Sequence, residues 1–267
     1  MDTKKIIYYW NMKSSLNCNN YITHIHLLSI TFDFNKDNMP YIYMGNYSPY
    51  NPIYNHIWDQ LEIIAKKGIY IVIVIGGSNN TYYNLFTYYD IFKSLLIQFL
   101  KDKYHIISGI NIMIDDEYTT CKNIQLFISD IFNKFRQTFY KKKFIISITS
   151  YNNMIINRSI SCHMSYIKLY NTKEGKLIDY FNCISYYHYN YTVADIINVG
   201  FNINKIVIGC IYIDNIKDYC MTIENIKNIN NKNKKNINKS IGGICVLEYN
   251  KLPTNWDYYI YLALKSV

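Results

Sequence analysis

The chain has 267 residues, half of them apolar, with 28 basic and 19 acidic side chains and a formal charge of +9. It can therefore bury the core of one large domain or two small ones, which excludes global disorder. The longest apolar run, Ile69–Ile75, is far shorter than the roughly 18 residues that a membrane span needs.

The sequence shows neither a secretory signal nor a cysteine pattern typical of disulfides or of a zinc site. No apolar segment with a small-residue cleavage site follows Lys4 and Lys5, so no secretory signal is indicated. The seven cysteines, scattered from Cys18 to Cys245, predict neither a disulfide framework nor a zinc site. We expect a cytoplasmic protein, although export by a route without a signal peptide stays open.

The positive charge is compatible with a polyanion partner. Five of the lysines, however, lie among asparagines within residues 227–239. Such a run is typical of a solvated loop, so we expect no nucleic-acid partner.

Short β-branched and aromatic runs alternate with longer helical patterns along the chain. The short runs predict eight strands: Ile6–Trp10, His24–Phe32, Ile69–Ile75, Ile106–Ile114, Phe144–Thr149, Tyr180–Tyr186, Lys205–Ile211 and Gly243–Leu247. The longer patterns predict helices at Ile57–Lys67, Tyr89–Asp102, Lys122–Phe139, Ala194–Val199, Ile216–Ile229 and Trp256–Ser266. The link Tyr151–Leu177 has room for at least a turn or two of helix.

Several predicted strands are apolar nearly throughout, as expected of strands covered on both faces. Alternation of strand and helix predicts right-handed crossovers and a parallel sheet. Eight such units in a chain of 267 residues fit an α/β fold of the (β/α)8 TIM-barrel type. An open doubly wound sheet is the rival, but it would place a glycine-rich loop after the first strand, where Tyr8–Asn11 has none. We expect residues 1–267 to form a single barrel domain.

The clearest local feature is the acidic triplet that follows the strand Ile106–Ile114. In such barrels, functional side chains come from the carboxyl ends of the strands. Side chains alternate along a strand, so we expect Asn111, Met113, Asp115 and Glu117 to face the barrel axis. Two carboxylates at positions i and i+2 can supply a general acid and its electrostatic partner. The alternative is that the triplet caps the following helix.

The order of the motifs resembles glycoside hydrolase family 18, the chitinase-like barrels. Seven segments carry the resemblance, in order: Tyr8-Tyr9-Trp10, Ile22–Ile25, the turn Val74-Ile75-Gly76-Gly77, Ser108–Asp115, Ile178–Tyr186, Lys205–Gly209 and Gly242–Glu248. The Val74–Gly77 turn is similar to the family's Ser-x-Gly-Gly turn, with Val74 where serine is usual. The resemblance implies a barrel with a substrate groove at the carboxyl ends of its strands.

The resemblance also implies a reaction. In that family the glutamate of an Asp-x-x-Asp-x-Asp-x-Glu signature is the acid, the preceding aspartate positions the N-acetyl group, and the acetamido oxygen attacks the anomeric carbon. Anchored on Gly109, the signature positions read Ser108, Asn111, Met113 and Asp115, which shortens the glutamate and replaces its aspartate partner by methionine. A shift by two residues instead places Asp115 and Glu117 on the last two positions. Both alignments keep the same facing, and both stay open.

The resemblance makes Asp115, Glu117 and Tyr186 the expected catalytic residues, with Tyr186 contacting the substrate. Leu247 stands where the family has a sugar-stacking tryptophan. The expected binding residues are Trp10, Asn111, Met113, His188 and Leu247.

His24 and His26 lie two residues apart in one predicted strand, and theirs is the only spacing that suggests a metal site. No third ligand has a diagnostic spacing, and the resemblance implies strand packing for both. We therefore predict no metal and no cofactor.

Two functions follow. The first is a chitinase-like barrel with weakened or lost hydrolase activity, which binds glycans of the N-acetylglucosamine type or a protein partner. The second is an active glycosidase for β-1,4-linked N-acetylglucosamine glycans, with Glu117 or Asp115 as the acid. Substitutions at Met113, Val74 and Leu247 together favour the first.

Overall fold

A computed structural model gives the structure of the chain. It describes residues 5–10, 12, 21–77, 80–114, 119–137, 144–151, 155–156, 164–185, 195–210, 224, 227–228, 231, 240–246 and 255–265.

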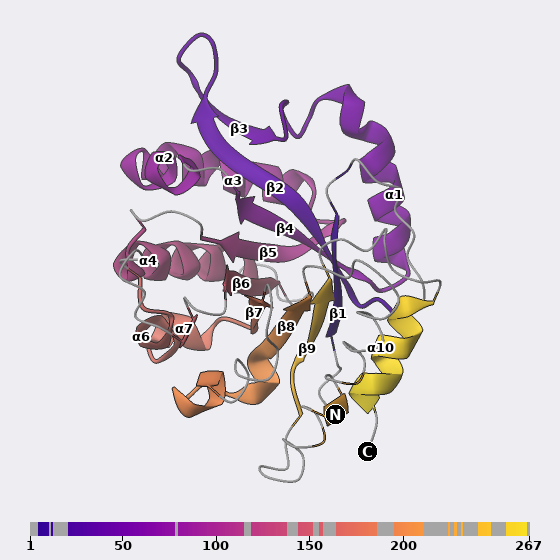
Figure 1. The fold of residues 1–267 in the computed structure, drawn as a ribbon. Helices are drawn as coiled ribbons and strands as arrows, with labels where there is room; N and C mark the ends of the chain where they lie inside the picture. Colours follow the sequence, from indigo (N-terminus) through magenta and orange to yellow (C-terminus); the bar gives the residue numbers. More distant parts are fainter. Residues whose placement is uncertain are drawn as a thin grey trace.

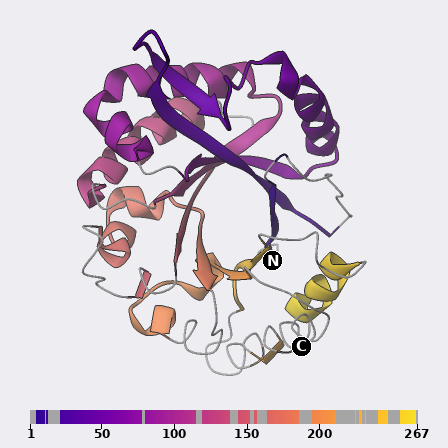
Figure 2. The same cartoon turned by 45° about the horizontal axis from the view of Figure 1, so that its top comes forward.

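Eight parallel strands form a closed ring (Figures 1 and 2). In chain order they are β1 (Lys5–Trp10), β2 (His24–Phe34), β4 (Tyr70–Gly76), β5 (Ile107–Met113), β6 (Ile145–Tyr151), β7 (Tyr180–Ser185), β8 (Ile206–Cys210) and β9 (Gly243–Val246). The ring closes because β1 pairs in parallel with both β2 and β9. The eight predicted strands and the (β/α)8 barrel are therefore confirmed.

The alternation of side chains divides the apolar residues into two separate clusters. The larger one lies between the ring and the surrounding helices, and includes Ile110 and Ile112 of β5. The smaller one, called here the inner apolar cluster, lies inside the ring. It consists of Val72, Val74, Ile145, Tyr180, Val207 and Cys245, with Leu28 and Met113 packed against it. A strand covered on both faces needs apolar side chains at consecutive positions, which explains why β4 reads Tyr-Ile-Val-Ile-Val-Ile-Gly.

Helices surround the ring (Figure 1). The α-helices named in the structure are α1 (Asn55–Lys66), α2 (Thr81–Thr87), α3 (Tyr89–Asp102), α4 (Cys121–Ile131), α6 (Tyr166–Tyr170), α7 (Lys173–Lys176) and α10 (Trp256–Lys265). Short helical turns are η1 (Pro52–Tyr54) and η3 (Ile203–Lys205), and the π-helical segment η2 (Phe132–Gln137) continues α4.

Most of the predicted helices are present. α3 has the predicted bounds, α1 and α10 begin and end near theirs, and α4 begins near its predicted start. Residues 195–198 are helical as predicted, and α6 and α7 lie in the link Tyr151–Leu177. The predicted helix Ile216–Ile229 lies almost wholly outside the described residues. The predicted helix Lys122–Phe139 corresponds to α4 and η2, and its α-helical pattern changes to a π-helical one at Phe132.

Among the described α-helices and strands, α2 and β3 (Pro40–Met44) were not predicted. The helix α2 is rich in tyrosine and threonine, which have weak helix propensity. The strand β3 pairs antiparallel with the second half of β2, and it stands outside the alternation of strand and helix.

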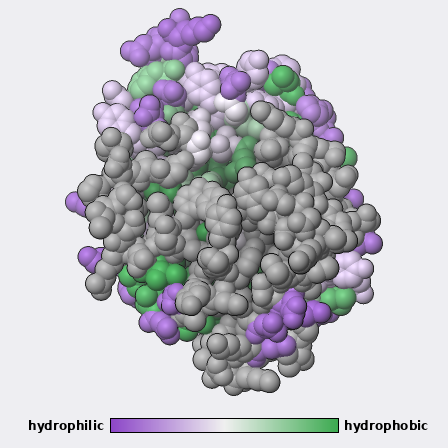
Figure 3. Space-filling view, in the orientation of Figure 1, coloured by the Kyte–Doolittle hydropathy of each residue, from purple (hydrophilic) through white to green (hydrophobic). Residues whose placement is uncertain are grey.

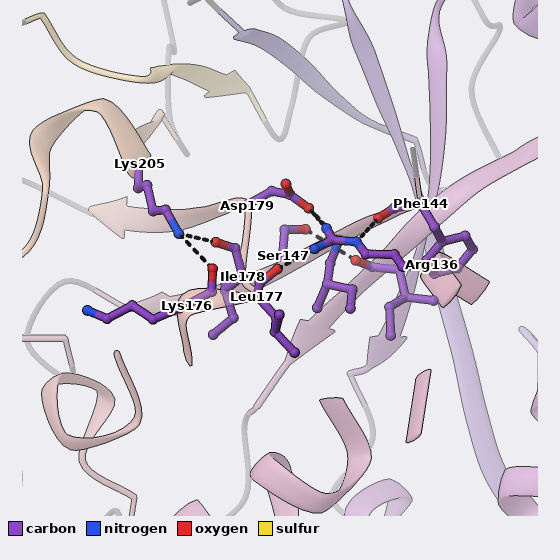
Figure 4. A network of polar contacts seen from close by, with 10 residues as sticks. Arg136, Phe144, Ser147, Lys176, Leu177, Ile178, Asp179 and Lys205 are labelled. Atoms are coloured by element: carbon purple, nitrogen blue, oxygen red, sulfur yellow. Dashed lines mark hydrogen bonds and ion pairs between the residues drawn. The ribbon is translucent and has the colours of Figure 1, made fainter. Parts of the chain in front are cut away.

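A polar network ties together the amino ends of β6, β7 and β8 (Figure 4). Arg136 of η2 donates from Nε to the carbonyl of Phe144 at 2.6 Å and from Nη1 to the carbonyl of Leu177 at 2.9 Å, and it forms an ion pair with Asp179. The Asp179 carboxylate also accepts from the backbone N–H of Ile146 at 3.0 Å. Lys205 continues the network by donating to carbonyls of the segment that precedes β7. In (β/α)8 barrels this end of the ring contributes stability, so we assign the network a structural role.

Candidate functional site

The carboxyl ends of β4 and β5 approach each other closely at the mouth of the barrel. β4 ends in Gly76, with φ +122°, and Gly77 follows with φ +82°. A Cβ on Gly76 would lie 2.1 Å from the backbone carbonyl oxygen of Met113. Only glycine satisfies both conditions, because other residues rarely adopt these φ angles and none has room for a side chain here. The Gly-Gly turn therefore sets the spacing of the mouth beside Met113.

A layer of polar side chains lies beneath the mouth. Asn111 donates from Nδ2 to the Ser147 hydroxyl at 2.9 Å, and its Oδ1 accepts from the Thr149 hydroxyl at 2.8 Å. Asn182 donates from Nδ2 to the same Thr149 oxygen at 3.0 Å. These four residues, called here the polar layer, are at most 1% exposed. Because each buried polar group needs a partner, their contacts hold β5, β6 and β7 in one register.

Tyr180 connects the polar layer to His26 on the opposite side of the ring. Its hydroxyl lies 3.0 Å from His26 Nε2, and it also interacts with the Ser147 side chain. Burial lowers the pKa of His26 to about 3 and raises the pKa of Tyr180, so both side chains are neutral at pH 7.

The two histidines of β2 have separate partners. His24 Nδ1 lies 2.7 Å from the Thr23 hydroxyl, and the His24 ring packs against the rings of Tyr70 and Tyr180. Within the described part of the chain, no three histidine, cysteine, aspartate or glutamate side chains are grouped closely enough to hold a metal ion.

Met113 is the last residue of β5, and its side chain packs against the inner apolar cluster. The predicted facing of Asn111 and Met113 is thus confirmed, since Ile110 and Ile112 lie under the helices. The described side chains of the inner apolar cluster and the polar layer, together with His24 and His26, include no carboxylate, lysine or arginine. The described interior beneath the mouth therefore offers no carboxylate that could act as an acid or hold a substrate amide.

The helix that follows the acidic triplet has another residue as its N-cap. α4 begins at Cys121, and its N-cap is Thr120, whose hydroxyl accepts from the backbone N–H of Asn123. The first turn of α4 contains no acidic residue. The triplet itself lies outside the described residues.

The predicted site residues fall into two groups. Asp115, Glu117, Tyr186, His188 and Leu247 lie outside the described residues, so their roles stay predictions. The backbone of Trp10 pairs with Leu27, whose side chain faces the helices, while the Trp10 side chain is outside the described part.

Asn111 and Met113 are described. The Asn111 amide is fully buried and bonded on both sides, which makes it a support of the layer beneath the mouth. Direct contact of either residue with a ligand stays a prediction.

Sequence analysis missed the two partners of Asn111, Ser147 and Thr149, and the neighbouring Tyr180 and Asn182. Ser147, Thr149, Tyr180 and Asn182 lie at inward positions of two predicted strands. A signal was present, because polar residues spaced by two interrupt otherwise apolar strands. Which strand supplies a partner for Asn111, however, depends on the order of strands in the ring.

No family profile and no curated protein matches the chain in sequence. Solved structures do match its fold. A fungal endo-β-N-acetylglucosaminidase of glycoside hydrolase family 18 superposes with a TM-score of 0.72 at 16% identity, covering 99% of both chains. A chitinase, ChiC, from Aspergillus fumigatus superposes with a TM-score of 0.73 at 14% identity, covering 98% of this chain and 99% of the other.

A family 18 chitinase from Cycas revoluta, solved in complex with (GlcNAc)3, has a TM-score of 0.61 at 10% identity, covering 97% of this chain and 98% of the other. The fold is therefore that of the chitinase-like (β/α)8 barrels. No helix among the described residues combines the length and the apolar character needed to span a membrane.

Proposed function

We propose that this protein binds a glycan containing N-acetylglucosamine at the carboxyl-end mouth of its barrel, with weakened or lost hydrolase activity. The observation that carries the proposal is Met113. It occupies the inner face at the end of β5, where the family resemblance, anchored on Gly109, expects the aspartate that positions the N-acetyl group. A thioether is only a weak hydrogen-bond acceptor, so Met113 cannot hold an amide N–H as a carboxylate does.

The surroundings of Met113 support the loss of activity. None of the described side chains beneath it is a carboxylate, and so none of them replaces the missing aspartate. Under the same alignment the acid is Asp115, which is one methylene shorter than glutamate. A displacement of about 1 Å at a reacting group can cost roughly a hundredfold in rate.

The glycan class is supported by the fold and by the names of the proteins that share it. Those proteins are an endo-β-N-acetylglucosaminidase and two chitinases, one of them solved with (GlcNAc)3. The closed ring, the Gly-Gly turn and the polar layer beneath the mouth provide a rigid base for a sugar. Met113 can still pack against the apolar face of a pyranose ring. Replacement of the aspartate by methionine therefore weakens hydrolysis but still permits glycan binding.

The test combines turnover with binding. We expect wild-type protein to bind chitotriose in calorimetry, with an affinity that added salt hardly changes, and to release little or no fluorophore from a chitobiose or chitotriose substrate. Restoring the signature with Met113→Asp and Asp115→Glu together should increase the release. Ile63→Asp is the control, since Ile63 is 58% exposed on α1, away from the hairpin, and should change nothing.

Other results would overturn the proposal. Efficient release by the wild type that Glu117→Gln or Asp115→Asn abolishes would establish an active glycosidase. Failure to bind any chitin oligomer would refute glycan binding, and affinity for a polyanion that falls steeply with salt would indicate a different partner class.

A further inference from the structure

The hairpin formed by β2 and β3 raises one side of the barrel wall above the mouth (Figures 1 and 2). β2 pairs with β4 only as far as Ile30. It then continues to Phe34 while pairing with β3 from Ile30–Met44 to Phe34–Pro40. Because β2 runs toward the carboxyl end of the ring, this extension stands at the same end as the candidate site.

The two faces of the hairpin differ. Ile30, Phe32, Ile42 and Met44 belong to the apolar core under the helices. Side chains alternate along both strands, so the opposite face carries Thr31, Asp33, Tyr41 and Tyr43. We call these four residues the hairpin wall.

The hairpin wall is on the barrel side of the sheet. In the first half of β2, Ile25 and Leu27 face the helices, which leaves His24 and His26 facing the interior. An irregularity between Leu27 and Ile30 shifts the pattern by one residue. After it the helix-facing positions are even-numbered, so Thr31 and Asp33 continue the inner face above the mouth.

Adjacent tyrosines and a carboxylate make up this wall. The rings of Tyr41 and Tyr43 have centroids 4.8 Å apart, and both side chains are partly exposed. Asp33, directly opposite Tyr41 in the register, is exposed. Its Oδ1 accepts from the backbone N–H of Phe34 at 2.8 Å and lies 3.4 Å from Asn84 Nδ2.

The wall is supported from α2, and so it is a defined surface. Asn84 of α2 is 7% exposed, and its Nδ2 donates to the carbonyl of Phe32 at 2.9 Å. The turn beyond the wall is also ordered, because the Asn35 side chain accepts from the backbone N–H groups of Asp37 and Met39 at 3.0 and 2.9 Å. In Figure 3 the tip of the hairpin, at the top of the view, is strongly hydrophilic and projects from the molecule.

Partly exposed tyrosines beside a carboxylate suit a neutral carbohydrate. The C–H faces of a pyranose ring pack on aromatic rings, while the tyrosine hydroxyls and the aspartate bond to sugar hydroxyl or amide groups. The wall contains an acid and no base, so charge does not favour a polyanion. We propose that the hairpin wall binds the outer sugars of an extended oligosaccharide of N-acetylglucosamine whose inner sugar occupies the mouth. This rests on the glycan binding proposed above.

The test compares short and long oligomers by calorimetry. Wild-type protein should bind chitopentaose more tightly than chitobiose. Tyr41→Ala with Tyr43→Ala should lower the affinity for chitopentaose by about tenfold and leave that for chitobiose unchanged. Tyr259→Ala is the control, since Tyr259 is an exposed tyrosine, at 48%, on α10. Melting temperatures and circular dichroism of all variants establish that each is folded.

The outcomes separate the two proposals. If wild-type protein binds both oligomers equally, or if the double variant keeps the wild-type affinity for chitopentaose, the hairpin wall has no such role and glycan binding at the mouth stands. If neither oligomer binds to the wild type, both proposals fail. Equal loss of affinity for both oligomers in a folded double variant also contradicts a role confined to outer sugars.

Discussion

The backbone carbonyl oxygen of Met113 lies 2.1 Å from the position that a Cβ on Gly76 would take. The backbones of β4 and β5 therefore approach each other too closely at the mouth for a side chain at Gly76. Any substitution of Gly76 should lower the stability of the fold. Gly76→Ala should lower the free energy of unfolding by about 3 kcal/mol, since strain at φ +122° adds to the clash with backbone.

Gly68→Ala is the matched control for this prediction. Gly68 also has a positive φ, +85°, but nothing lies within 4 Å of its Cβ position. Gly68→Ala should lower the free energy of unfolding only by the conformational strain, about 1 kcal/mol. Urea denaturation of both variants measures the difference, and equal costs would show that the contact with Met113 is not tight.

The polar layer predicts the effect of removing Asn111. Asn111→Leu leaves the hydroxyls of Ser147 and Thr149 without their buried amide partner. We expect a loss of about 2–4 kcal/mol in the free energy of unfolding, measured by urea denaturation. Asn46→Ala, at an exposed asparagine, should change it by less than about 0.5 kcal/mol. If Asn111→Leu is as stable as the wild type, the polar layer does not help to hold β5, β6 and β7 in register.

His26 predicts how stability depends on pH. Its pKa is about 3 in the folded protein, below the ordinary value of 6.5, because burial disfavours the charged imidazole. Between these values the unfolded chain binds the proton and the folded chain does not, so stability falls as the pH falls below 6.5. This group alone contributes a slope of about 1.4 kcal/mol per pH unit over that window.

Two variants check the origin of this slope by urea denaturation at several pH values. His26→Phe should reduce the loss of stability between pH 6 and pH 4. Tyr180→Phe removes the hydroxyl near His26 Nε2 but leaves the imidazole buried inside the barrel. This variant should therefore retain the dependence of stability on pH. An unchanged slope in His26→Phe would contradict the prediction.

The network at the amino ends of the strands predicts a purely structural phenotype. Arg136→Met leaves Asp179 without its guanidinium partner, and both side chains are largely buried. We expect a loss of about 3 kcal/mol in the free energy of unfolding, with the affinity for chitotriose unchanged in the folded fraction. Replacing exposed Lys66, which pairs with Glu62, should leave stability unchanged within error. Altered glycan affinity in Arg136→Met would place this network closer to the site than the fold indicates.

The strands and their facing were predictable because both depend on local patterns. Alternation has a period of two, so apolar Ile110 and Ile112 determined that Asn111 and Met113 face inward. The hairpin was not predictable from the strand–helix rhythm, since β3 is an antiparallel addition to β2. That Thr120 is the N-cap of α4 was known only from the observed start of this helix at Cys121.

The amino-acid sequence by itself determined eight strands, their inward and outward faces and the resemblance to chitinase-like barrels. Tertiary structure decided which polar residues meet: Asn111 with Ser147 and Thr149, and His26 with Tyr180, across 154 positions of sequence. Such pairs depend on the order and register of strands around a closed ring. Local periodicity carries the direction of each side chain, whereas only the assembled ring brings distant side chains within hydrogen-bonding distance.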